Sequence, residues 1–124
     1  MLLNPLLLVP GNEVRDVEIT IDVPGGVSSC TLSWTSWMYG SRDGEWDHLY
    51  VNDDEVWSGW RDNGGWRDVD APQNAGQDYG GIWVTDQSVQ VSCSGQLRVR
   101  FHSDIDEGRR NEGWAFNNFN VAGA

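Results

Sequence analysis

Residues 97–121 read LRVRFHSDIDEGRRNEGWAFNNFNV, and this stretch decides the fold class. Apolar and polar side chains alternate from Leu97 to Phe101, which is the period of a β-strand with one buried face. Four carboxylates then fall within nine residues, and a Gly-Trp step opens a second strand from Trp114 to Val121. The stretch predicts two strands of a β-sandwich with a carboxylate corner between them.

The same alternation recurs upstream. Val17, Ile19, Ile21 and Val23 share one face of a strand, and Pro24-Gly25-Gly26 then turns the chain. Further strands are predicted at residues 29–35, 47–51, 55–57, 82–84 and 89–93, with a tight hairpin turn at residues 52–54. No segment has helical periodicity, and residues 61–81 read as a long polar excursion. Short strands and frequent turns predict one all-β domain, an antiparallel sandwich of jelly-roll type.

The last strand breaks its own alternation. Trp114 and Phe116 have one parity, whereas Phe119 and Val121 have the other. A β-bulge near residues 117–118 would let all four side chains face the core, so a bulge is predicted there.

The composition is strongly acidic: 19 Asp and Glu stand against 8 arginines and no lysine, for a net charge of -11. This charge argues against nucleic acid and anionic membranes as partners, because it opposes phosphate neutralisation. Calcium, cationic partners or neutral glycans fit better. Eight tryptophans and fifteen glycines argue against disorder.

Two cysteines, Cys30 and Cys93, both lie on the apolar parity of predicted strands. They are either two buried thiols or one disulfide, and the disulfide is favoured because the composition suggests an extracellular or cell-surface protein. Such a bridge closes a long loop, which is worth about 4 kcal/mol in the chain-entropy model.

The amino-terminal segment predicts an apolar arm over residues 1–12, ahead of a sandwich domain over residues 13–124. Its apolar side chains include Leu2, Leu3, Leu6, Leu7 and Leu8. The segment lacks the features of a signal peptide and is too short to span a membrane, so no membrane insertion is expected. The arm either covers the domain's own sheet edge or inserts into a neighbouring copy, and both remain open.

The carboxylate corner suggests a calcium site. Asp47 has the inward parity of its strand, where a carboxylate is costly unless it is paired or bound to a metal. Asp104, Asp106 and Glu112 complete the predicted ligand set, since calcium takes six to eight oxygen ligands. The alternative is that these acids are solvated and neutralised by nearby arginines.

Two segments resemble CUB domains. Residues 46–51, WDHLYV, are similar to the aromatic-Asp-x-Leu-x-Val strand, and residues 97–104, LRVRFHSD, are similar to the later strand ending in Phe-x-Ser-Asp. The resemblance implies that Asp47 and Asp104 help hold calcium. Residues 111–118 instead resemble MAM domains and jelly-roll modules of protist and algal surface proteins. The chain departs from CUB domains in having two cysteines rather than four.

Loop aromatics offer three interpretations. Trp60, Trp66 and Tyr79 lie near Asn, Asp and Gly, and they could be lids over the sandwich ends, an interface or a glycan platform.

A basic stripe lies on the outward parity of one predicted strand, formed by Arg98 and Arg100 with His102. This stripe is expected to pair with Glu18 and Asp22 on an adjacent strand.

Together these features predict a non-catalytic structural or adhesive module that is stabilised by calcium. Its arm is expected to mediate association with copies of itself or with other surface proteins. The alternatives are a calcium-dependent carbohydrate-binding module and a small glycosidase-like enzyme. The enzyme is disfavoured because Tyr50 stands where jelly-roll glucanases place a glutamate, three residues after the aspartate.

Overall fold

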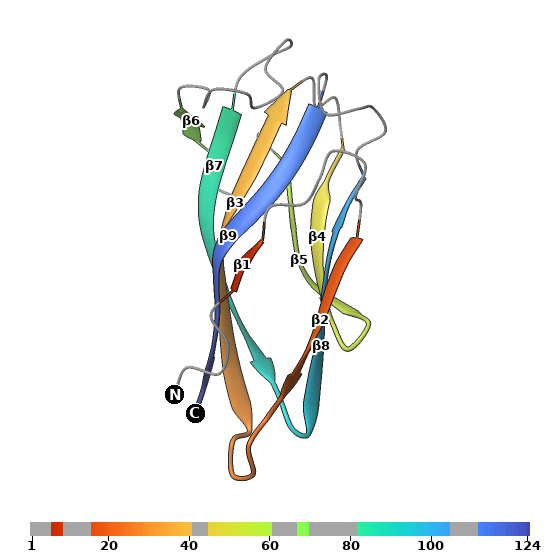
Figure 1. Cartoon of the computed structure of the whole chain (residues 1–124), viewed down its shortest axis with the longest axis vertical. Helices are drawn as coiled ribbons and strands as arrows, with labels where there is room; N and C mark the ends of the chain where they lie inside the picture. Colours follow the sequence, from red (N-terminus) through yellow and green to blue (C-terminus); the bar gives the residue numbers. More distant parts are fainter. Residues whose placement is uncertain (1–5, 9–15, 41–44, 61–66, 70–81, 105–111) are drawn as a thin grey trace.

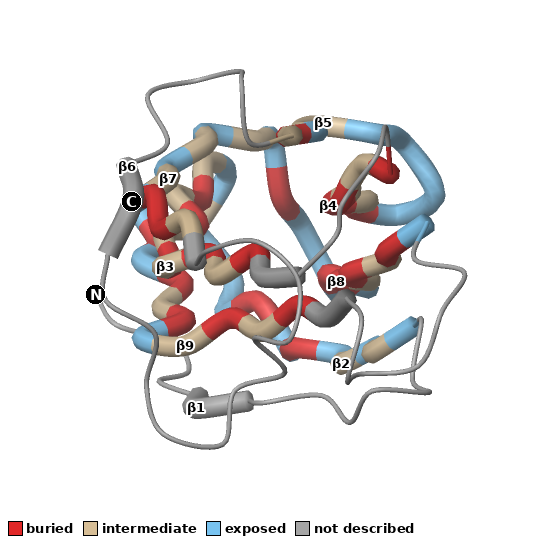
Figure 2. The backbone as a smooth tube through the Cα atoms, turned by 90° about the horizontal axis from the view of Figure 1, so that it is seen from above, coloured by how far each residue is buried: buried red, intermediate tan, exposed pale blue. Residues whose placement is uncertain are grey.

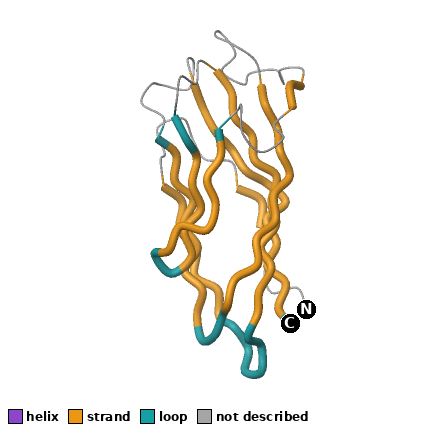
Figure 3. The backbone as a smooth tube through the Cα atoms, turned by 180° about the vertical axis from the view of Figure 1, so that it is seen from behind, coloured by secondary structure: helices purple, strands orange, loops and turns teal. Residues whose placement is uncertain are grey.

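The computed structural model describes residues 6–8, 16–40, 45–60, 67–69, 82–104 and 112–124, and every regular element among them is a β-strand (Figure 1, Figure 3). The strands are β1 (Leu6–Leu8), β2 (Asp16–Asp22), β3 (Ser29–Gly40), β4 (Asp47–Val51), β5 (Asp54–Gly59), β6 (Arg67–Val69), β7 (Ile82–Ser92), β8 (Gln96–Ser103) and β9 (Glu112–Gly123).

Two antiparallel sheets form the sandwich. One has the order β1-β9-β3-β7-β6 and the other the order β2-β8-β4-β5. The pairs β1 with β9, β2 with β8, β3 with β7 and β4 with β5 are nested around the β4–β5 turn. The chain is therefore a long hairpin rolled up across two sheets, which is the jelly roll that the alternation predicted.

The core lies between the sheets, where the buried positions of the two layers face each other (Figure 2). Its side chains come from the inward parity of both sheets. Trp34 meets Trp57 and Phe101 edge-on, with ring centroids 5.3 and 5.5 Å apart. Phe101 in turn stacks on Phe116 from the opposite sheet. Edge-to-face aromatic contacts add to the burial of apolar area, so this cluster ties the layers together.

The hairpin turn predicted at residues 52–54 is confirmed. Asn52 and Asp53 both have positive φ, 49° and 70°, between paired residues Val51 and Asp54. Positive φ at both central residues is the type I′ hairpin turn, whose twist matches the strands that it joins.

The bulge in the last strand is also confirmed. Asn118 has φ of 54°, and the β3–β9 register shifts between Ser33 and Thr35. The shift brings both parities of β9 to the inside, so the four apolar side chains flanking it are at most 2% exposed: Trp114, Phe116, Phe119 and Val121.

Cys30 and Cys93 form the predicted disulfide. Their Cα atoms are 5.9 Å apart and 63 positions separate them in the chain. The bridge joins the start of β3 to the residue just after β7, so it fixes the end of two neighbouring strands. Closing a loop of this length restricts the unfolded chain, which favours folding by about 4 kcal/mol in the entropy model.

One strand prediction is wrong. Residues 82–84 and 89–93 were expected to be separate strands, but Ile82–Ser92 is one continuous strand, β7. The polar run between them reads as a loop, yet Gln87 Nε2 donates to Thr85 Oγ1 at 3.0 Å. That bond satisfies polar side chains on the inward parity and lets the strand continue through them. The short strand β6 was not predicted at all.

The amino-terminal leucines contribute the edge of the five-stranded sheet. In β1, Leu6 is opposite Phe119 and Leu8 is opposite Phe116 of the same chain. Of the two positions considered for the arm, this is the one on the domain's own sheet edge. Leu2 and Leu3 lie outside the described residues.

Candidate functional site

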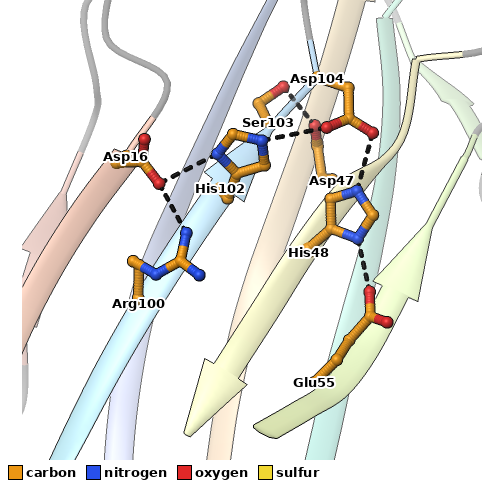
Figure 4. Close-up of polar contacts among 8 residues, drawn as sticks. All are labelled: Asp16, Asp47, His48, Glu55, Arg100, His102, Ser103 and Asp104. Carbon is orange, nitrogen blue, oxygen red and sulfur yellow. Dashed lines mark hydrogen bonds and ion pairs between the residues drawn. The ribbon is translucent and has the colours of Figure 1, made fainter. Parts of the chain in front are cut away.

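Six side chains form a polar cluster on the outer face of the four-stranded sheet (Figure 4). We call it the carboxylate–histidine cluster, and its members are Asp16, His48, Glu55, Arg100, His102 and Asp104. Strand pairing assembles it, because His48 of β4 is opposite His102 of β8, and Asp16 of β2 is opposite His102 on the other side. The two imidazole centroids are 5.7 Å apart.

Each histidine lies between two carboxylates. His48 Nδ1 is 2.5 Å from Glu55 Oε1, and His48 Nε2 is 2.8 Å from Asp104 Oδ2. His102 Nδ1 is 3.0 Å from Asp16 Oδ1, and His102 Nε2 is 3.0 Å from Asp104 Oδ1. Asp104 therefore bridges the rings, with one carboxylate oxygen on each.

The arrangement around His48 favours its protonated form. A neutral imidazole has one N–H donor and one lone pair, whereas an imidazolium donates from both nitrogens. Burial lowers the pKa of His48, but hydrogen bonds and charge from Asp104 and Glu55 outweigh it and raise the pKa above 6.5. His48 in the folded protein therefore binds its proton more tightly than a free histidine side chain in water does.

Arg100 completes the cluster at the β2 side. Its guanidinium donates to Asp16 at 2.8 Å and lies 4.2 Å from the centroid of the Tyr50 ring. Burial raises the pKa of Asp16, but hydrogen bonds from Arg100 and His102 lower it by more, so the pKa lies below its usual value of 3.8. The pKa of Asp104 is likewise raised by burial and, in net, lowered below 3.8 by the two imidazoles.

The net charge of the cluster depends on His48. Three carboxylates and one guanidinium sum to two negative charges, and a protonated His48 reduces this to one. All four ring nitrogens face carboxylate oxygens. The cluster therefore binds four strands together, β2, β8, β4 and β5, and its ring nitrogens contact carboxylates of the same chain.

The basic stripe pairs differently from the prediction. Arg98 donates to Asp53 Oδ2 at 2.8 Å, and Arg100 pairs with Asp16, in place of Glu18 and Asp22. Asp22 instead accepts a hydrogen bond from Gln96 Nε2 at 3.2 Å. The reason is geometric, because the hairpin turn carries Asp53 to the edge of β8.

The predicted calcium ligands separate into two environments. Asp47 is 4% exposed and accepts a hydrogen bond from Ser103 Oγ at 2.6 Å on the inner face, whereas Asp104 binds the histidines on the outer face. Glu45, two residues before Asp47, is also buried, at 7% exposure. Asp106 lies outside the described residues, as does the side chain of Glu112.

No group of three or more His, Cys, Asp or Glu is placed to hold a metal ion within the described ranges. Calcium therefore stays a prediction. A buried carboxylate needs a proton, a hydrogen bond or a cation, and Asp47 has the hydrogen bond from Ser103.

Of the predicted aromatic platform, only Trp60 can be placed. It is half-buried and stacks on Trp46, with ring centroids 6.4 Å apart. Trp66 and Tyr79 lie outside the described residues, so the glycan platform also stays a prediction.

Sequence reasoning did not find the cluster as a unit. His102 was placed in the outward stripe with Arg98 and Arg100, and Asp104 was assigned to calcium. The available signal was parity: both histidines are outward residues near one end of predicted strands. What was missing was the lateral order β2-β8-β4-β5, which alone brings Asp16 and Glu55 to the two rings.

No family model matches this chain, and no curated protein or solved structure matches it either. The resemblance to CUB and MAM domains accordingly remains a prediction from residues 46–51, 97–104 and 111–118. The described part of the chain contains no helix long and apolar enough to cross a membrane.

Proposed function

We propose that this chain is a non-catalytic, extracellular structural module that associates with copies of itself by exchanging its N-terminal arm. The observation that carries the proposal is the position of β1. Three leucines, Leu6–Leu8, form the last strand of the five-stranded sheet and pair only with β9 among the described strands. Strands β2 to β9 make up the rest of the described sandwich.

Exchange follows from the kind of bond involved. An edge strand that pairs with β9 of its own chain makes the same hydrogen bonds with β9 of a second copy. Exchanging an identical element is therefore a low-cost route to a dimer. In the present structure β1 pairs within its own chain, which is the arrangement of a lone module. The concentration dependence of association distinguishes a lone module from copies that exchange their arms.

Three further features support a structural role. The disulfide Cys30–Cys93 fits an oxidising compartment. The carboxylate–histidine cluster links β2, β8, β4 and β5 by ion pairs among its own members. The net charge of -11 keeps single copies soluble, so association needs a specific surface rather than general attraction.

The test is deletion of residues 1–10. We expect the full chain to form particles whose size grows with concentration in static light scattering, and the deletion variant to be folded but smaller. Circular dichroism and an intact Cys30–Cys93 bridge establish that the variant is folded. A matched control replaces Leu2 and Leu3 by serine and keeps β1, and it should associate like the full chain.

A folded deletion variant with unchanged association would show that the arm is not the interface. A full chain that stays monomeric at every concentration would remove self-association altogether.

A further inference from the structure

The four edges of the two sheets are protected to different degrees. In the four-stranded sheet, the edge strand β2 carries Asp16, Glu18 and Asp22, and the edge strand β5 carries Asp54 and Glu55. Charged side chains on an edge discourage pairing with another chain. In the five-stranded sheet, the edge strands β1 and β6 have three residues each, so they cover only part of β9 and β7.

Most of β7 extends beyond β6. The pairing of β6 with β7 covers Ile82 to Val84, whereas β7 continues to Ser92. No described strand pairs with β7 on that side after Val84. Ser88 is four residues further along, which at about 3.3 Å per residue leaves roughly 13 Å between it and the end of β6.

The backbone directions identify which groups face outward. The Cys93 N–H donates to the Ser28 carbonyl at 3.1 Å, so the peptide groups of Cys93 face β3. Successive residues of a strand point these groups to alternate sides. The N–H and C=O groups of Ser88, Gln90 and Ser92 therefore point away from β3, along the side that β6 leaves uncovered.

This segment is also uncharged. Ser88, Gln90 and Ser92 are all exposed, and the Gln90 side chain donates to Ser29 Oγ at 2.8 Å. In a chain with net charge -11, two copies repel each other most where their acids meet. Residues 88–92 bring no charge to such a contact, in contrast to the acidic edges β2 and β5.

We propose that residues 88–92 of β7 pair antiparallel with the same residues of a second copy, with Gln90 opposite Gln90. The two-fold relation places Ser88 opposite Ser92 of the partner subunit, and Ser92 opposite Ser88 of the partner subunit. Each of the three facing pairs exchanges two backbone hydrogen bonds, and one sheet then runs through both copies.

This interface rests on the proposed self-association and adds its second surface. The strand order β1-β9-β3-β7-β6 puts the arm at one edge of the sheet and residues 88–92 at the other. A two-fold contact at each of two opposite edges does not close on itself, so alternation of the two builds an open chain of molecules.

The two-fold register gives a specific test in the full chain. Ser88→Glu with Ser92→Glu sets like charges opposite each other at two places, and we expect the dissociation constant to rise at least about tenfold. Ser88→Glu with Ser92→Arg sets opposite charges there and should restore association. Thr20→Glu with Ser58→Glu adds the same two charges on other edges and should change association little.

Association is measured by sedimentation equilibrium, and amide hydrogen exchange is measured alongside it. We expect the amides of Ser88, Gln90 and Ser92 to become protected as concentration rises. If the chain associates while these amides exchange equally at low and high concentration, the β7 interface is wrong and arm exchange stands. If the Glu/Glu and Glu/Arg variants associate equally, the two-fold register is wrong. A chain that remains monomeric would instead refute the proposed function.

Discussion

At the scale of single residues, the two carboxylates beside His48 make its contribution to stability depend on pH. Its pKa is raised above 6.5 in the folded protein, so its contribution to stability is fully present below about pH 6.5 and is lost as pH rises through the higher folded value. The lowered pKa values of Asp16 and Asp104 act oppositely: their contributions are present above about pH 4 and are lost in stronger acid. The cluster therefore stabilises the fold most between about pH 4 and 6.5.

The loss of stability expected between pH 6 and 8.5 should be smaller in the variant His48→Gln than in the parent. The difference between variant and parent should be on the order of 1 kcal/mol at pH 5.5 and shrink toward pH 8.5, because partly exposed ion pairs have this size. Urea unfolding at several pH values measures it. In NMR titrations, Glu55→Gln should lower the pKa of His48. An imidazole that titrates at or below 6.5 in the parent would contradict the arrangement of Glu55 and Asp104 around it.

At the scale of elements, the bulge in β9 depends on Asn118. Its φ of 54° lies in the left-handed region, which glycine and asparagine adopt readily and β-branched residues do not. The side chain is exposed, so a substitution changes backbone preference with little change in burial.

We expect Asn118→Gly to keep the stability of the parent within a few tenths of a kcal/mol, and Asn118→Val to lower it by about 1–2 kcal/mol. The midpoints of urea unfolding provide the comparison. Ala122→Val, at an exposed position of the same strand that does not have positive φ, is the matched control for added β-branching. Equal stability of the Gly and Val variants would mean that β9 does not need a left-handed residue to bring Phe119 and Val121 inside.

At the scale of the whole molecule, calcium is a prediction that concerns the stability of the sandwich. A ligand that binds only the folded state raises its stability. If calcium binds at the rim that holds Glu45 and Asp47, a chelator should lower the midpoint of thermal unfolding by several degrees, and Asp47→Asn should abolish the difference. Scanning calorimetry with calcium and with chelator measures both.

The control is Asp104→Asn, which changes the outer-face carboxylate and leaves Asp47 with Ser103. A chelation effect that survives in Asp47→Asn but not in Asp104→Asn would move the site to the outer face. An unchanged midpoint in the parent would mean that hydrogen bonds alone hold these carboxylates.

Local patterning predicts much of this fold. Apart from β6 and the middle of β7, the strands show as period-two alternation, so their approximate positions, their inward faces and the matching parity of Cys30 and Cys93 follow from neighbouring residues. Parity conflict in β9 likewise required a bulge, because Phe119 and Val121 could not otherwise be buried with Trp114. These features depend only on neighbours along the chain.

The lateral order of the strands follows from the three-dimensional packing alone. Which strands lie side by side depends on contacts between residues far apart in sequence, and alternation carries no information about them. That order brings Asp16 and Glu55 to the two histidines and pairs Arg98 with Asp53. The same order leaves residues 88–92 of β7 without a described strand on one side. Whether a strand lies at the edge of a sheet depends on its neighbours and not on its own sequence.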